Sequence, residues 1–185
     1  MPVNLIGLTE DELRRLAADW GEAPYRGSQL FHALYAQRRR DFQTLSNLPR
    51  SLRAKLAEQA SIGLPGIDER YASSDGTIRY VLRLVPSEVE GFDDGQTIET
   101  VFMPDVRRQT LCLSTQAGCA VDCHFCATAQ LGLLRNLNAG EIVSQVLVAL
   151  EDNRARLKPQ TNVVLMGQGE PLLNYENVLR AVALL

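Results

Sequence analysis

Cysteine is scarce in this chain of 185 residues, and all four cysteines lie between Cys112 and Cys126. Long apolar runs are absent, since none reaches the roughly 18 residues that a membrane-spanning helix needs. The N-terminus has no basic patch followed by an apolar run, so it does not resemble a secretory signal. Internal repeats and low-complexity tracts are also absent. We therefore expect a globular protein of the cytoplasm with no membrane partner, in a compartment where thiols stay reduced.

The formal net charge is only −3, but the charge is unevenly distributed. Residues 25–57 carry a single acidic side chain, Asp41, among seven basic ones. These basic residues are Arg26, Arg38, Arg39, Arg40, Arg50, Arg53 and Lys55. The segment is either a solvated helical face or a surface that binds the phosphates of a nucleic acid.

Residues 1–66 predict a small helical domain. Thr9 and Glu12 form the S/T-x-x-E pattern of a capping box, which marks the start of a first helix. A second helix is expected from about Gly27, and a third from Pro49, a favourable residue for a first turn. Glycine and proline then mark the boundary of this domain.

Residues 67–108 predict a strand pair. The stretches "TIRYVLRLV" (77–85) and "TIETVFMP" (97–104) are rich in β-branched and aromatic residues, and "GFDDGQ" (91–96) separates them. Such a pattern is typical of an antiparallel β-hairpin.

Residues 109–185 predict alternating strands and helices. A buried strand is expected in "TLCLSTQ" (110–116) and another in "TNVVLMG" (161–167). Asn138 and Glu141 form a helix cap between them, and a further helix begins near Glu176. This order favours an α/β fold with parallel strands. Two such units cannot close a barrel, so we expect the front part of a longer protein.

The cysteines allow several interpretations. A disulfide framework is unfavourable for thiols that lie so close together in a reducing compartment. A structural zinc site needs four ligands, which Cys112 could complete. Three buried and inert cysteines are a further alternative. An iron–sulfur cluster fits the short spacing of Cys119, Cys123 and Cys126, because short spacers wrap a loop around the cluster.

Three thiolates from one loop would leave one iron of a [4Fe–4S] cluster without a protein ligand. An open metal position distinguishes catalytic from structural sites in zinc proteins, and we apply the same reasoning here. The pattern therefore favours chemistry at the cluster over simple electron transfer.

Several stretches of the sequence resemble a known family. The C-x3-C-x2-C run with Phe125 before its last cysteine is similar to the radical S-adenosylmethionine (SAM) superfamily. "LCLSTQAGCAVDCHFCATAQLGLLRNLNAGEIVSQV" (111–146) and "NVVLMGQGEPLLN" (162–174) resemble the dual-specificity ribosomal and transfer RNA adenine-C2 methyltransferases. "WGEAPYRGSQLFHALY" (20–35) and "LSNLPRSLRAKL" (45–56) resemble the N-terminal helical domain of that family.

The resemblance implies a role for each matching residue. Cys119, Cys123 and Cys126 would hold a [4Fe–4S] cluster. Gly169 and Glu170 lie in the Gly-Glu-Pro segment that contacts SAM. Residues 109–185 would form the first part of a radical-SAM partial (β/α) barrel.

Two further residues match catalytic positions of the family. Glu99 corresponds to the proton acceptor. Cys112 corresponds to the thiol that resolves a covalent enzyme–RNA intermediate by forming a disulfide with a cysteine further along the chain. No cysteine follows Cys126 here.

The implied function is methylation of adenine C2 in 23S ribosomal RNA and transfer RNA, with two SAM molecules and an electron-donor protein, by an enzyme expected to be monomeric. C8-specific enzymes of the related resistance subfamily share much of the pattern. An RNA-binding module with a structural metal site would use the same cysteines and basic helices. An inactive fragment is a further alternative.

Overall fold

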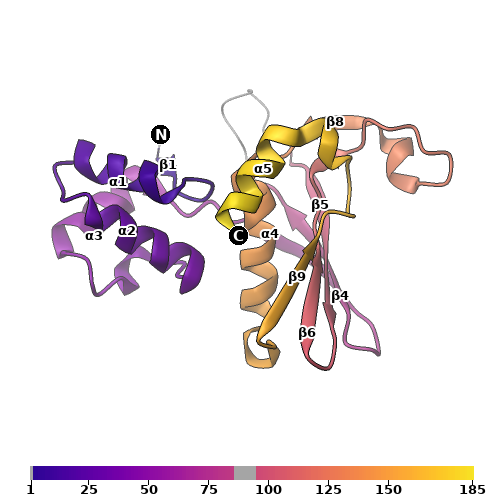
Figure 1. Cartoon of the computed structure of the whole chain (residues 1–185), viewed down its shortest axis with the longest axis horizontal. Helices are drawn as coiled ribbons and strands as arrows, with labels where there is room; N and C mark the ends of the chain where they lie inside the picture. The colour runs from indigo at the N-terminus through magenta and orange to yellow at the C-terminus, as the bar shows by residue number, and fades with distance from the viewer. Residues whose placement is uncertain (1, 86–94) are drawn as a thin grey trace. The chain divides into compact units, whose positions relative to one another are not determined.

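The computed structural model describes residues 2–85 and 95–185, which divide into two compact units (Figure 1). Met1–Gly63 and Leu184–Leu185 are grouped in the first unit, and Leu64–Ala183 in the second. Most of the separating segment predicted at 91–96 lies outside the described residues.

The first unit contains the three predicted helices, α1 (Glu10–Asp19), α2 (Tyr25–Phe31) and α3 (Arg50–Gln59). The capping box is confirmed, since the Glu12 amide donates to Thr9 Oγ1 and the Thr9 amide donates to the Glu12 carboxylate. These bonds satisfy amides that the first turn of a helix leaves without an intrahelical partner.

The second helix is not uniform. Residues His32–Ala36 form a π-helix (η1) directly after α2, whereas the sequence pattern predicts one continuous α-helix. The chain then turns at Arg38, whose φ of 52° is unusual for a residue other than glycine. The unit is completed by β1 (Val3–Asn4), β2 (Ala60–Ser61) and the 3-10 helix η2 (Phe42–Thr44).

The second unit is built on a five-stranded sheet with the order β3-β4-β5-β6-β9. Its strands are β3 (Gly66–Ala72), β4 (Ile78–Arg83), β5 (Thr97–Pro104), β6 (Arg108–Cys112) and β9 (Gln160–Val164). The predicted antiparallel pairing of β4 with β5 and the predicted parallel pair β6–β9 are both confirmed. The expected α/β class is therefore confirmed, and the antiparallel and parallel parts belong to one sheet.

One face of this sheet packs against α4 (Ala139–Asp152), as Figure 1 shows. The Thr100 hydroxyl on β5 donates to Gln145 Oε1 on the helix (2.7 Å), and both residues are fully buried. Since side chains alternate along a strand, Glu99 and Val101 lie on the face opposite α4. Both of these residues are only partly buried.

Further short elements and one helix complete the described chain. They are β7 (Gln116–Gly118), β8 (Leu133–Asn136), α5 (Tyr175–Leu184) and the 3-10 helices η4 (Ala127–Leu131), η5 (Arg154–Arg156) and η6 (Pro171–Asn174). The Asn138–Glu141 cap predicted for α4 is confirmed as a capping box. Among the described residues, no helix has the length and apolar character needed to cross a membrane.

Tyr80 is a buried polar anchor between β4 and the end of α4. Its hydroxyl donates to Asp152 Oδ2 (2.6 Å) and accepts a bond from Asn153 Nδ2 (2.7 Å). We expect Tyr80→Phe to lower the free energy of unfolding by about 1–2 kcal/mol, because a buried hydrogen-bonding group is lost while its neighbours keep other partners. Urea unfolding followed by circular dichroism measures this difference. Tyr71→Phe is the control, since Tyr71 is half exposed and should change stability little.

Ionisation of Tyr80 should make the stability of the folded protein depend on pH. Burial raises the pKa of Tyr80, so the folded state favours the protonated phenol. Its contribution to stability is complete below the ordinary tyrosine pKa of about 10 and is lost as the pH rises from there toward the higher folded pKa. The wild type should therefore lose stability above pH ~10 more steeply than Tyr80→Phe. Equal slopes for the two proteins would contradict this assignment.

Candidate active site

The candidate site lies where the parallel strands β6 and β9 end. Parallel strands bring their carboxyl ends to the same edge of a sheet, and sites in parallel α/β folds form there. The Leu113 amide donates to the Val164 carbonyl (2.9 Å), and the Gly167 amide donates to the Leu113 carbonyl (2.9 Å). The two segments that follow these strands are thus joined to each other by their backbones.

Ser114 links three parts of the site. Its hydroxyl donates to the carbonyl oxygen of Glu99 (2.6 Å) and accepts a bond from the Gln168 amide (3.0 Å). Gln145 holds the Ser114 backbone in turn, accepting from its amide and donating to its carbonyl (both 2.8 Å). Because Ser114 and Gln145 are fully buried, these bonds tie the position of Glu99 to that of the segment containing Gln168.

The Gly-Glu-Pro segment is fixed by Gln116. The side-chain oxygen of Gln116 accepts a hydrogen bond from the Glu170 amide (3.0 Å). A Cβ atom on Gly169 would lie 2.6 Å from Gln116 Cβ, and Gly169 has a φ of 97°. Only glycine suits this combination of a left-handed backbone and close approach. The Glu170 carboxylate itself accepts the Leu172 amide (3.0 Å) and caps η6.

Glu99 and Cys112 lie on the same face of the sheet. Val101 on β5 is the register partner of Cys112 on β6, so these two side chains point to the same side. Glu99 is two residues from Val101 and shares that side, diagonally adjacent to Cys112. The structure therefore brings together the two residues predicted to be catalytic, although they are separated along the chain.

The charge of Glu99 is paired. Arg79 on β4 places Nη1 2.6 Å from Glu99 Oε1, and both side chains remain partly exposed to solvent. Cys112 has no charged partner of this kind among the described residues. Burial raises the pKa of the Cys112 thiol, and the Met166 amide opposes this effect by donating a hydrogen bond. The thiol form is therefore favoured at Cys112 in this arrangement.

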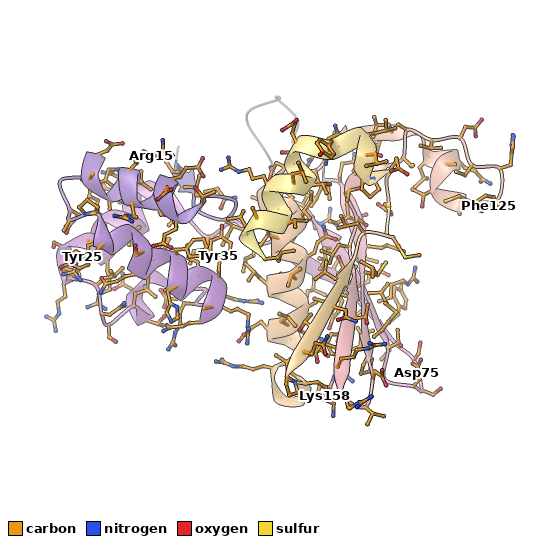
Figure 2. The ribbon with its side chains drawn as sticks, in the orientation of Figure 1. Arg15, Tyr25, Tyr35, Asp75, Phe125 and Lys158 are labelled. Atoms are coloured by element: carbon orange, nitrogen blue, oxygen red, sulfur yellow. The ribbon has the colours of Figure 1, made fainter. Side chains whose placement is uncertain are left out.

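The other three cysteines lie in the loop between β7 and β8, with Cys126 immediately before η4. Figure 2 shows Phe125 of this loop at the end of the sheet opposite Lys158, which precedes β9. Phe125 is 94% exposed. The loop therefore projects from the edge at which the parallel strands end.

The donor chemistry of this loop suits an iron–sulfur cluster, but the described residues do not converge on a metal. Each of Cys119, Cys123 and Cys126 is partly exposed and free, so three thiol donors are present on one loop. No three His, Cys, Asp or Glu side chains among the described residues lie close enough together to bind a metal ion. Cluster binding would require the loop to bring its sulfur atoms together.

Hydrogen bonding around Cys126 favours the ligand form of its side chain. The amides of Ala129 and Thr128, with the Thr128 hydroxyl, lower the pKa of Cys126. A thiolate is the form that binds metal. All four cysteines are free, so the structure contains no disulfide. The partner expected for Cys112 is a cysteine further along the chain than Cys126, and this sequence has none there.

The basic side chains of the first unit fall into two groups, partly exposed ones that donate to backbone carbonyls and more exposed ones. Arg26 donates to the Asn47 carbonyl (3.0 Å), Arg53 to the Gln43 carbonyl (2.7 Å) and Lys55 to the Trp20 carbonyl (3.1 Å). Three other basic residues are exposed to solvent: Arg39, Arg40 and Arg50. These exposed guanidinium groups are the ones best placed to bind phosphates.

Known proteins share both the sequence and the fold. Residues 3–62 match the family described as "Ribosomal RNA large subunit methyltransferase N-terminal domain". Dual-specificity RNA methyltransferase RlmN of Alkalilimnicola ehrlichii is 44% identical over 183 residues, covering 99% of this chain and 49% of that protein. RlmN of Rhodospirillum rubrum is 41% identical over 190 residues, covering 100% of this chain and 42% of that protein. This chain matches an N-terminal part of the RlmN family.

A solved structure supports the same assignment. A radical SAM methyltransferase from Sphaerobacter thermophilus has a TM-score of 0.87 and 41% sequence identity, covering 99% of this chain and 52% of that one. The chain spans about half the length of the RlmN relatives that it matches.

Sequence reasoning missed the residues that support the candidate site. Ser114, Gln116 and Gln145 carry its internal hydrogen bonds, and Arg79 pairs with Glu99. Gln145 could have been noticed, since it lies among the apolar residues that α4 turns toward the sheet. A buried amide in such a position needs polar partners.

Proposed function

We propose that this chain forms the N-terminal half of a radical SAM methyltransferase that methylates C2 of an adenine in 23S ribosomal RNA and in transfer RNA. The observation that supports this most strongly is the network around Ser114. It links Glu99, the Gly-Glu-Pro segment and the strand leading to the cysteine loop at one edge of the sheet. A partial (β/α) barrel would place its site at this edge.

Cys119, Cys123 and Cys126 would hold a [4Fe–4S] cluster through their thiolates. When bound, such a cluster supplies the electron that initiates radical chemistry on SAM, which an amino-acid side chain cannot provide. The cysteine loop lies at the edge where the parallel strands end, and Cys126 is surrounded by donors that favour its thiolate. The chain's own contribution is to present three thiols from one loop, with no fourth cysteine in that loop.

Gly169 and Glu170 would bind SAM. Gly169 allows the backbone conformation in which Glu170 is presented, because its φ of 97° and its close approach to Gln116 suit only glycine. A carboxylate such as Glu170 can accept a hydrogen bond from the ammonium group of SAM. Gln116 and Ser114 hold this segment in place before the ligand arrives.

Glu99 would accept the proton that leaves the methylated carbon, and Cys112 would provide a thiol beside it during release of the modified base. Their shared face supports this pairing, because a base held above the sheet could reach both side chains. Arg79, on the neighbouring strand β4, would hold the Glu99 carboxylate in place on this face.

Arg39, Arg40 and Arg50 would bind the phosphates of the RNA substrate. The target adenine must leave its stack to reach the sheet, as bases do in other enzymes that modify them. We further propose a monomeric, cytoplasmic protein that receives electrons from a separate donor protein.

Anaerobic reconstitution with iron and sulfide, followed by electron paramagnetic resonance (EPR) of the reduced protein, tests the function. We expect a cluster signal whose shape changes on addition of SAM, because a cluster with three thiolate ligands has an iron open to SAM. A signal that SAM leaves unchanged, or a protein that takes up zinc instead, would favour an RNA-binding module with a structural metal site.

A further inference from the structure

An aromatic ring and a guanidinium group lie beside Glu99 on the sheet face opposite α4. Tyr71 on β3 is the register partner of Arg79 on β4, and Arg79 is in turn the partner of Val101 on β5. Val101 pairs with Cys112 on β6. These four residues form one row across four adjacent strands, and register partners point to the same face. The row therefore connects Tyr71 to the proposed catalytic thiol.

Side-chain contacts join Tyr71 and Arg79 of this row to Glu99. The Arg79 guanidinium carbon lies 4.5 Å from the centre of the Tyr71 ring, and Arg79 Nη1 lies 2.6 Å from Glu99 Oε1. The Tyr71 hydroxyl donates to the Glu69 carboxylate. Ring, guanidinium and catalytic carboxylate thus form a continuous chain of contacts.

This arrangement remains accessible. Tyr71 is 48% exposed, and the side chain of Arg79 is 46% exposed. A pair that served only to hold the edge strand β3 would gain more from burial, since an exposed cation–π contact contributes about 0.5–1 kcal/mol. The exposed area is therefore free to contact a ligand.

The chemistry of the pair fits an unpaired nucleobase. Proteins that recognise single-stranded or displaced bases stack them on aromatic rings and on arginine guanidinium planes. Arg79 contacts both the Tyr71 ring and Glu99, so a base stacked on its guanidinium would lie next to Glu99. An apolar peptide would instead be opposed by the three charged groups at Glu69, Arg79 and Glu99, whose desolvation is costly.

We propose that Tyr71 and Arg79 form the platform on which the target adenine stacks beside Glu99 and Cys112. This inference rests on the proposed function and adds two positioning residues to it. It assigns to the strand pair β3–β4 the task of holding the displaced base, separately from the phosphate contacts of the first unit.

Binding of two hairpin RNAs tests the platform. One hairpin carries a single adenine in a loop of uridines, and the other has an abasic site in place of that adenine. Fluorescence anisotropy with the reconstituted chain should give about five- to 150-fold tighter binding of the adenine hairpin, the range expected for one stacked base. Tyr71→Ala should reduce this ratio to near one, whereas Tyr71→Phe, which keeps the ring, should preserve it.

Tyr25 provides a matched control. It is 54% exposed and also lies under a guanidinium group, that of Arg26, but it belongs to the first unit. Tyr25→Ala should leave the adenine-to-abasic ratio unchanged, even if both affinities fall together. Circular dichroism checks that each variant is folded.

The outcomes separate the two proposals. Equal affinity of the wild type for both hairpins would contradict the proposed stacking platform, and so would a preference for adenine that persists in Tyr71→Ala. Neither result would contradict the proposal that the chain binds RNA. Loss of the preference in Tyr25→Ala would also overturn the platform. If the wild type binds neither hairpin at low salt, the RNA substrate itself is contradicted.

Discussion

Replacing Gly169 with alanine is expected to lower the free energy of unfolding by about 2–5 kcal/mol. A left-handed backbone costs an L-residue about 1–2 kcal/mol, and forcing a methyl group into a packed site costs about 1–3 kcal/mol. Both penalties apply here, because Gly169 has a φ of 97° and a Cβ atom would lie 2.6 Å from Gln116 Cβ and 2.7 Å from its backbone nitrogen. The SAM-dependent change in the EPR signal should disappear as well, since the Gly-Glu-Pro segment would be displaced.

Alanine substitutions at two other glycines measure the backbone cost and the packing cost separately. Gly132 has a φ of 67°, but a Cβ atom added there would have no neighbour within 4 Å, so Gly132→Ala should show the backbone cost alone. Gly167 lies outside the left-handed region, but its Cβ would be 2.7 Å from the Leu113 carbonyl, so Gly167→Ala should show the packing cost alone.

Urea unfolding followed by circular dichroism measures all three variants. Trp20 is the single tryptophan and belongs to the first unit, so its fluorescence reports whether that unit is unaffected. An effect of Gly169→Ala no larger than that of Gly132→Ala would show that Gln116 does not constrain the Gly-Glu-Pro segment.

Loss of bound iron should be nearly complete when Cys119, Cys123 or Cys126 is replaced by alanine. A cluster held by three thiolates cannot retain its anchoring with two, so the iron content after anaerobic reconstitution should fall from about four atoms per chain to near zero. Colorimetric iron and sulfide analysis measures this directly.

Cys112→Ala is the matched control for these variants. Cys112 ends β6, in the sheet, and its pKa is raised by burial, whereas the three loop cysteines are outside the sheet. We expect Cys112→Ala to keep its full iron content. Loss of metal in all four variants would instead indicate a site with four thiolate ligands, as in structural zinc proteins.

The sequence predicted those structural elements that are specified by residues close together along the chain. The capping boxes at Thr9 and Asn138 were recognisable because all their partners lie within three residues. The π-helix was not recognisable, since the apolar residues before and within it keep the spacing of an α-helix. Strand β3 was also missed, because every one of its residues is exposed and the alternation of buried and exposed positions is lost.

The site was predictable only in part, for a similar reason. The resemblance to a family pointed to Glu99 and Cys112, but their shared face depends on strand register, which is a property of the folded sheet. The bonds between Ser114 and Gln145 join residues 31 positions apart, and no local pattern reveals such a pair. The Tyr71–Arg79 contact likewise appears only once β3 is placed beside β4.

The central claim is that a cluster on the three loop cysteines has an iron that binds SAM. Electron–nuclear double resonance of the reduced, reconstituted chain tests it most directly, with SAM labelled with nitrogen-15 in its amino group. We predict a hyperfine coupling between the cluster and the labelled nitrogen, and the same coupling in Cys112→Ala. A cluster signal with no coupling at saturating SAM would contradict the claim.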